Sequence, residues 1–218
     1  MIPHYFRLDD DAALAFVARQ GAGTLVTVDP DGTFRSTFLP IVLEGDTILL
    51  HLARFNDQWK TSPSTGIMVV TGAHGHISSA DYELHEGGTS ASTWDYTQVT
   101  LHGDIEVHDD PQWVREAAVK LTALHDPTEA ENLPEAYLDR ATRAIIGMSL
   151  TITKIEAQAK LSQNKLPVER ERIAARLRAK NEPMSDQLAA DIEAAPSTAS
   201  RVPYLGSLRS VGHDIGPA

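Results

Sequence analysis

The segment TLVTVDPDGTFRSTFLPIVLEGDTILLHL, residues 24–52, decides the fold class. The turn signals Asp-Pro-Asp-Gly and Glu-Gly-Asp separate three runs of β-branched and apolar residues, 24–28, 33–43 and 47–52. Strands joined by such short turns are antiparallel, because parallel neighbours require a long crossover between them. The segment therefore predicts a meander of three antiparallel strands in a barrel or a sandwich, and it excludes a Rossmann sheet.

The chain on either side of this meander adds further strands and helices. Apolar runs or period-two alternation predict strands at 66–71, 93–108 and 147–156. Amphipathic spacing behind acidic or proline-containing starts predicts helices at 12–19, 111–124 and 134–145. The expected fold class is mainly antiparallel β with flanking helices.

The composition limits the kind of protein. With 42% hydrophobic and 22% charged residues among 218, the chain is typical of a soluble globular protein built on one main core. Its apolar stretches are far shorter than the roughly 20 residues of a membrane-spanning helix. The lack of cysteine excludes disulfides and thiolate sites, and an acidic start in place of a signal peptide favours a cytoplasmic address. The net charge of −11 argues against a broad DNA-binding surface.

Three polar clusters are the candidate functional segments. Residues 51–60, HLARFNDQWK, collect cationic side chains, amides and an indole at a predicted strand end. A guanidinium can hold a phosphate while a ring stacks, so this cluster fits an anionic planar ligand, with ordinary loop residues as the alternative. The other two are STWDY at 92–96 and KLSQNK at 160–165. The last has no turn residues, which favours hydrogen bonding to a ligand or a partner subunit.

Several common sites are not expected. The sequence contains no GxxxxGK, GxGxxG or GxSxG motif, which removes the commonest nucleotide folds and the hydrolase elbow. His74 and His76 share one strand face, but no third ligand lies nearby in the sequence. We therefore expect no metal site.

Four stretches in order resemble the PaiB family of FMN-binding negative transcriptional regulators. They are MIPHYF, HLARFNDQW, STWDYTQVTLHG and RAIIGMSLTITKIEAQAKLSQNK, and they cover about the first 165 residues. The resemblance implies a Greek-key, FMN-binding split β-barrel of the pyridoxamine-phosphate-oxidase-like type. It also implies a homodimer with FMN in a groove between the subunits.

The resemblance also carries over site residues position by position. Phosphate and ribityl contacts are expected from His51, Arg54, Asn56, Gln58 and Trp59. The other matched positions are Trp94, Tyr96, Lys160, Ser162, Gln163 and Asn164, which are expected to reach the site or the subunit boundary. Two departures stand out. Residues 76–82 lack the tryptophan, the proline and the first tyrosine of the family pattern, and Asp95 replaces an asparagine. An added carboxylate would disfavour a nearby phosphate or reduced flavin anion.

The predicted domains are a split-barrel domain at 1–167 and a helical extension at 168–218, whose Pro/Gly/Ser tail from Pro196 is expected to be mobile. Within the extension, Arg172, Arg176 and Lys180 share one helix face that could contact DNA. A solvated helix neutralised by neighbouring glutamates is the alternative.

The leading functional hypothesis is a cytoplasmic, homodimeric FMN protein of the PaiB type with a regulatory and redox-linked role. One alternative is an FMN-dependent oxidoreductase or a haem-binding or haem-degrading split-barrel protein, in which a histidine would be the axial ligand. The other is a cofactor-free interaction module.

Overall fold

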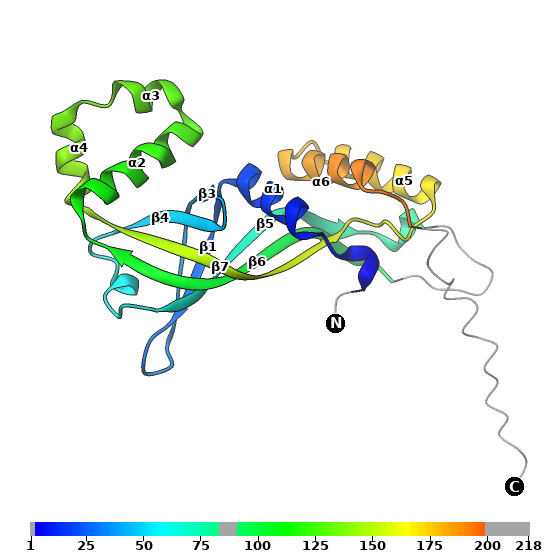
Figure 1. Cartoon of the computed structure of the whole chain (residues 1–218). Helices are drawn as coiled ribbons and strands as arrows, with labels where there is room; N and C mark the ends of the chain where they lie inside the picture. Colours follow the sequence, from blue (N-terminus) through cyan, green and yellow to red (C-terminus); the bar gives the residue numbers. More distant parts are fainter. Residues whose placement is uncertain (1–2, 83–90, 199–218) are drawn as a thin grey trace, which may run out of the picture. The chain divides into compact units, whose positions relative to one another are not determined.

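The computed structural model describes residues 3–82 and 91–198, and within them seven strands form one sheet in the order β2-β1-β5-β6-β7-β4-β3 (Figure 1). The strands are β1 (Ala22–Val28), β2 (Phe34–Pro40), β3 (Val42–Glu44), β4 (Thr47–Ala53), β5 (Thr65–Ile77), β6 (Thr93–His108) and β7 (Ile145–Lys160). The β1–β2, β1–β5, β3–β4 and β4–β7 pairs are antiparallel. β2 also contacts β4, near the other end of the order, so the sheet curls into a barrel. The predicted fold class is confirmed.

The predicted strand at 33–43 is wrong in one respect, because the structure divides it into β2 and β3. Pro40 ends β2 and lacks the N–H that a continuing ladder would use. The next residue, Ile41, is buried and donates its N–H to the carbonyl of Gly21. Here a contact with a distant turn replaces the local strand ladder.

The helices are α1 (Asp10–Gln20), α2 (Pro111–His125), α3 (Pro127–Asn132), α4 (Glu135–Thr142), α5 (Pro167–Arg178) and α6 (Pro183–Ala194). Single 3₁₀ turns occur at η1 (His4–Phe6), η2 (Asp57–Trp59) and η3 (Ser79–Asp81). α1 begins where the Asp9 side chain accepts from the Ala12 N–H and ends at Gly21 with φ +62°, as its sequence predicts. In the part of the chain that the structure describes, no helix has the length and apolar content to cross a membrane.

The chain forms two compact units that are not continuous in sequence. The barrel unit contains residues 8–72 and 97–158, and the second unit contains the described residues of 1–7, 73–96 and 159–218. β5, β6 and β7 each contribute residues to both units. The predicted domain boundary after residue 167 falls inside the second unit, and the predicted mobile tail lies mostly outside the described residues, which end at 198.

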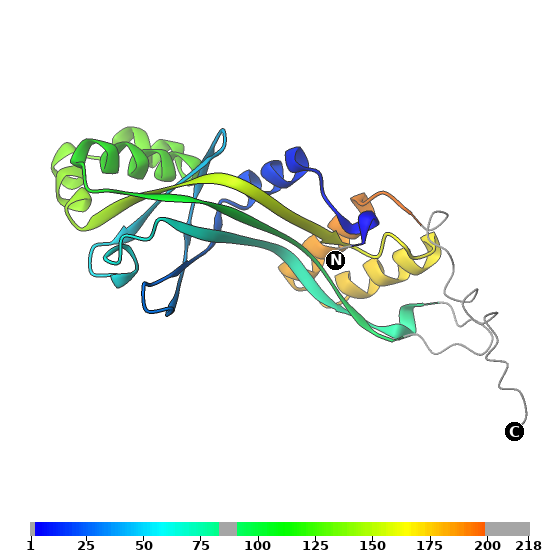
Figure 2. The ribbon, with the colours of Figure 1, turned by 60° about the horizontal axis from the view of Figure 1, so that its bottom comes forward.

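Strand alternation builds the core of the barrel unit. Inward residues such as Leu25, Leu50, Met68, Leu101 and Met148 are fully or almost fully buried, as period-two patterning requires. α2, α3 and α4 lie together, on the side of this unit away from the turn of the β1–β2 hairpin (Figures 1 and 2). In the second unit, α5 and α6 pack side by side, and buried aliphatic residues line their contact.

Candidate functional site

The segment 51–59, called here the site loop, runs from the end of β4 through η2. The side chain of Gln58 anchors this loop to the barrel unit. This side chain is 1% exposed. Its Nε2 donates to the Leu25 carbonyl at 3.3 Å and to Thr27 Oγ1 at 3.2 Å, and its Oε1 accepts from Thr37 Oγ1 at 2.6 Å. A buried, fully satisfied amide of this kind orders the elements that it joins. Gln58 therefore positions the site loop on the β1–β2 hairpin.

Asn56 and Trp59 shape the site loop from within. Asn56 Oδ1 accepts from the Gln58 N–H at 2.9 Å and caps η2, while its Nδ2 donates to Thr37 Oγ1 at 3.1 Å. The Trp59 indole N–H donates to the Arg54 carbonyl at 3.1 Å. Both polar groups are thus committed to the conformation of the loop.

Arg54 is the cation of the site loop, and its guanidinium has a fixed orientation. Nε donates to the Arg143 carbonyl and Nη2 to the Ile145 carbonyl, both at 3.1 Å. Nη1 and Nη2 also bond the two carboxylate oxygens of Asp109. These bonds raise the pKa of Arg54 and lower the pKa of Asp109. The pair is a bidentate guanidinium–carboxylate contact at the protein surface.

His51 lies on β4 opposite Gly147 of β7. Its Nδ1 is buried and has no hydrogen-bond partner among the described residues. Burial lowers the pKa of His51 below its ordinary value of 6.5, so the imidazole is mainly neutral at pH 7. An orphaned ring nitrogen beside a polar loop is a group that a ligand can satisfy.

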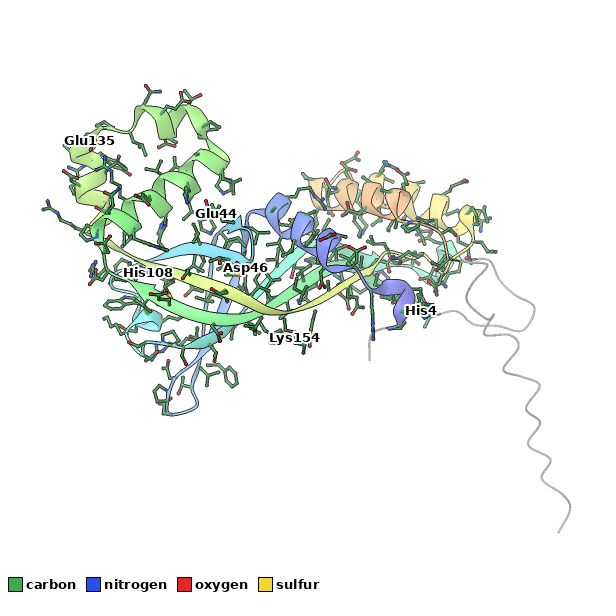
Figure 3. All side chains as sticks on the ribbon, in the orientation of Figure 1. His4, Glu44, Asp46, His108, Glu135 and Lys154 are labelled. Carbon is green, nitrogen blue, oxygen red and sulfur yellow. The ribbon has the colours of Figure 1, made fainter. Side chains whose placement is uncertain are left out.

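A second histidine nearby in the barrel unit is one that sequence reasoning did not single out. His108, labelled at the end of β6 in Figure 3, stacks on Trp113 with ring centroids 3.8 Å apart and bonds Ser149 Oγ at 2.9 Å through Nε2. The same indole covers Gly147, where an added Cβ would come within 2.2 Å of the Trp113 ring. Only glycine at 147 allows α2 to lie this close to β7.

The KLSQN segment lies in the second unit and ties the end of β7 to the start of β6. Lys160 Nζ donates to the Trp94 carbonyl at 2.6 Å and to Thr93 Oγ1, and it lies 3.4 Å from Asp95 Oδ1. The Ser162 hydroxyl donates to the other oxygen of Asp95. The side chains of Lys160 and Ser162, which the sequence predicts to bind a ligand or a partner subunit, thus have hydrogen-bond partners within the chain.

Gln163 stabilises the unusual backbone of the same segment. Its Oε1 accepts from the Leu161 N–H at 2.7 Å and its Nε2 donates to the Ala159 carbonyl at 2.6 Å. Ser162, which lies between Leu161 and Gln163, has φ +55°, a left-handed conformation that is uncommon for a residue with a side chain. The side-chain bonds hold this turn in place.

The predicted site residues therefore fall in two groups. The site-loop residues belong to the barrel unit, and Trp94, Tyr96 and residues 160–164 belong to the second unit. Trp94 is exposed and donates its indole N–H to His74 Nδ1 at 3.3 Å, while Tyr96 and Asn164 are half-buried.

Comparison with known proteins decides the family of this fold and site loop. The family model described as "Putative FMN-binding domain" matches residues 1–154. The chain belongs to this FMN-binding domain family. Protease synthase and sporulation protein PAI 2 of Bacillus subtilis (strain 168) is 26% identical over 199 residues, covering 86% of this chain and 94% of that protein. The resemblance to the PaiB family is thus confirmed.

Solved structures similar to this member of the FMN-binding domain family include two flavin proteins. The flavocytochrome Anf3 from Azotobacter vinelandii has a TM-score of 0.58 at 16% identity, covering 72% of this chain and 70% of its own. The FAD and heme binding protein from Mycobacterium smegmatis has a TM-score of 0.52 at 19% identity, covering 70% of this chain and 71% of its own. At these identities the similarity is one of fold.

Asp95, which departs from the family pattern, has its own partners in the structure. The residue is fully buried, and burial is the main cause that raises its pKa, against the contacts with Ser162 and Lys160. The carboxylate stands where the resemblance implies an asparagine, and it lies in a cluster of hydrogen bonds with Lys160 and Ser162. Its charge is therefore compensated within the second unit by Lys160.

Asp95→Asn tests this account through pH. Because the pKa of Asp95 lies above its ordinary value of 3.8, its contribution to the free energy of unfolding is complete below pH 3.8 and is lost as pH rises through the raised pKa. The unsubstituted chain should therefore lose stability relative to Asp95→Asn as pH rises toward neutrality. Urea denaturation at a series of acidic to neutral pH values measures the difference. Asp104→Asn, at an exposed position of β6, is the control and should show no such trend.

One residue of the candidate site was missed by sequence reasoning although a signal was present. The sequence has Asp109 and Asp110 before the proline that starts α2, where a single acid suffices as an N-cap. In the structure Asp110 is the cap, accepting from the Trp113 N–H at 2.9 Å. The surplus carboxylate is Asp109, which binds Arg54.

Proposed function

We propose that this chain binds FMN noncovalently through the barrel unit, with Arg54 holding the phosphate, and works as a cytoplasmic homodimer. The observation that carries the proposal is the fixed guanidinium of Arg54 in a chain of the FMN-binding domain family. The carbonyls of Arg143 and Ile145 orient the guanidinium. Its Nη1 and Nη2 hydrogens are therefore a pair of oriented donors, called here the fork, that can bind two oxygens of one oxyanion.

His51 adds a second group that fits the cofactor. Its buried Nδ1 lacks a partner among the described residues, and a neutral imidazole can donate to a phosphate or ribityl oxygen or accept from a ribityl hydroxyl. Gln58, Asn56 and Trp59 keep the backbone of the site loop in shape for these contacts. FMN, when bound, would supply electron transfer at its isoalloxazine ring.

The homodimer proposal is supported by exposed aromatic residues of the barrel unit. The chain has five phenylalanines, of which Phe6 and Phe16 are buried while Phe34, Phe38 and Phe55 are 75%, 74% and 86% exposed. Phe34 and Phe38 point to the same side of β2 because they are four residues apart. Large apolar groups left in water on one strand are typical of a protein interface.

The regulatory part of the proposal does not depend on α5 as a DNA-reading helix. Arg176 pairs with Asp81, Arg178 pairs with Glu193, and Arg170 donates to carbonyls at the end of α6. Of the predicted face of Arg172, Arg176 and Lys180, these contacts commit Arg176, and its partner is Asp81 rather than one of the neighbouring glutamates of the helix. We propose instead that the redox state of bound FMN is the regulatory signal.

The visible spectrum of the purified chain and an FMN titration test the proposal. The expected spectrum has the two flavin bands, and Arg54→Ala should weaken FMN binding by about 1.5–3 kcal/mol, or roughly tenfold to a hundredfold. Arg140→Ala, which removes an exposed arginine that stacks on Tyr137, is the control and should bind as before. A Soret band would favour the haem alternative. A colourless chain that does not bind added FMN would contradict the proposal and favour the cofactor-free interaction module.

A further inference from the structure

The carboxylate of Asp109 occupies the donors of Arg54 that a phosphate would need. Nη1 and Nη2 each donate to one Asp109 oxygen, which is the bidentate geometry that guanidinium groups use for phosphate as well. Among the described residues, Arg54 is the hydrogen-bonding and ion-pair partner of the Asp109 side chain. Asp109 has no share in capping α2, because Asp110 performs that role.

We propose that Asp109 is a built-in competitor of the cofactor phosphate: it holds Arg54 in the cofactor-free chain and leaves when a phosphate monoester binds. The inference rests on the proposed function. Two anions cannot share one guanidinium edge without strong repulsion, so the phosphate and Asp109 exclude each other.

The surroundings of the pair favour this exchange. The Asp109 side chain is 62% exposed, so its carboxylate can turn into water and be solvated there. Arg54 keeps its orientation when Asp109 leaves, because the Arg143 and Ile145 carbonyls still accept from Nε and Nη2. The Arg54 guanidinium is therefore already oriented for phosphate, and only the Asp109 carboxylate has to move.

The competition lowers the affinity of the site for phosphorylated flavin and leaves a flavin without phosphate unaffected. A flavin without phosphate, such as riboflavin, offers no anion to replace Asp109 on Arg54. A phosphate monoester brings more negative charge than a carboxylate and forms the same fork of hydrogen bonds. Asp109 thus limits how much affinity the phosphate group adds, because it lowers the affinity for every ligand that needs these two donors and leaves the others unaffected.

Asp109→Asn and Asp110→Asn are a matched pair for the test, because each removes one negative charge at adjacent positions. Asparagine also caps helices well, so Asp110→Asn preserves α2. FMN and riboflavin are titrated into the unsubstituted chain and both variants, at low and moderate salt, with flavin fluorescence as the readout. We expect Asp109→Asn to bind FMN about 5–20 times more tightly and riboflavin as before, and Asp110→Asn to change FMN affinity less than about twofold.

Thermal unfolding with inorganic phosphate gives a second readout that needs no flavin. Phosphate should raise the melting temperature of Asp109→Asn more than that of the unsubstituted chain, because the fork is free for the anion. If Asp109→Asn binds FMN no more tightly while Arg54→Ala weakens binding, the competitor role is wrong and the proposed function stands. An equal gain in FMN affinity in Asp109→Asn and Asp110→Asn would also overturn the competitor role, because it would show an effect of net charge near the site and not of Asp109 itself. If the unsubstituted chain and every variant refuse FMN, the proposed function fails first.

Discussion

Gln58→Ala should lower the free energy of unfolding by about 2–4 kcal/mol. The substitution removes a buried amide and leaves the Thr27 and Thr37 hydroxyls and the Leu25 carbonyl without this partner. It also opens a cavity beneath the site loop, because Gln58 is 1% exposed. Urea denaturation followed by circular dichroism measures the loss. We also expect weaker FMN binding, because the site loop loses its support.

Gln112→Ala is the matched control for Gln58→Ala. Gln112 is an exposed glutamine of α2 whose Nε2 bonds Glu116 one helical turn away. Removing it should change stability by no more than a few tenths of a kcal/mol. Equal losses in the two variants would contradict a positioning role for Gln58. A loss of stability in Gln58→Ala with unchanged FMN affinity would separate the site loop from the cofactor.

The double substitution Phe34→Ser and Phe38→Ser should convert the proposed dimer into a monomer without unfolding the barrel unit. Each phenylalanine contributes about 1.5–3 kcal/mol when an interface buries it fully. The two together should therefore raise the dimer dissociation constant at least about 100-fold. Because both rings are largely exposed in the single chain, the fold does not depend on them. Sedimentation at several protein concentrations gives the dissociation constant.

Met184→Ser is the control for the double substitution. Met184 is an apolar residue of α6 that is 52% exposed, and it belongs to the second unit. It should leave the oligomeric state unchanged. A dimer that persists in the double variant would place the subunit contact elsewhere, and an unsubstituted chain that is monomeric at every concentration would refute the homodimer.

The strands could be predicted from sequence where the pattern was long and local. β6 has the predicted bounds, 93–108, because the period-two alternation from Val99 to His108 is long and regular. The strand at 33–43 was wrong, because its break depends on a bond from Ile41 to Gly21, a partner twenty residues away. Local patterns determine strands well, whereas breaks in strands depend on tertiary partners.

The candidate site was predicted in residue type more than in role. The types and spacing of Arg54 and Gln58 predict a role in the site, but their partners decide what they do. Arg54 meets Asp109, which is 55 residues away in the chain, and Lys160 meets Asp95 across 65 residues. Such pairings are set by the sheet order, which a single sequence does not specify. Whether the site residues bind FMN remains a prediction until the titrations are made.

The division of β5, β6 and β7 between two units has a consequence for how the protein can be cut. Each of the three strands passes from one unit to the other, so the chain crosses the boundary several times. A protease that nicks one position cannot release either unit as a separate piece, and truncation at any single residue leaves part of a unit behind. A gene fusion could therefore transfer either unit to another protein only together with all the segments that cross the boundary.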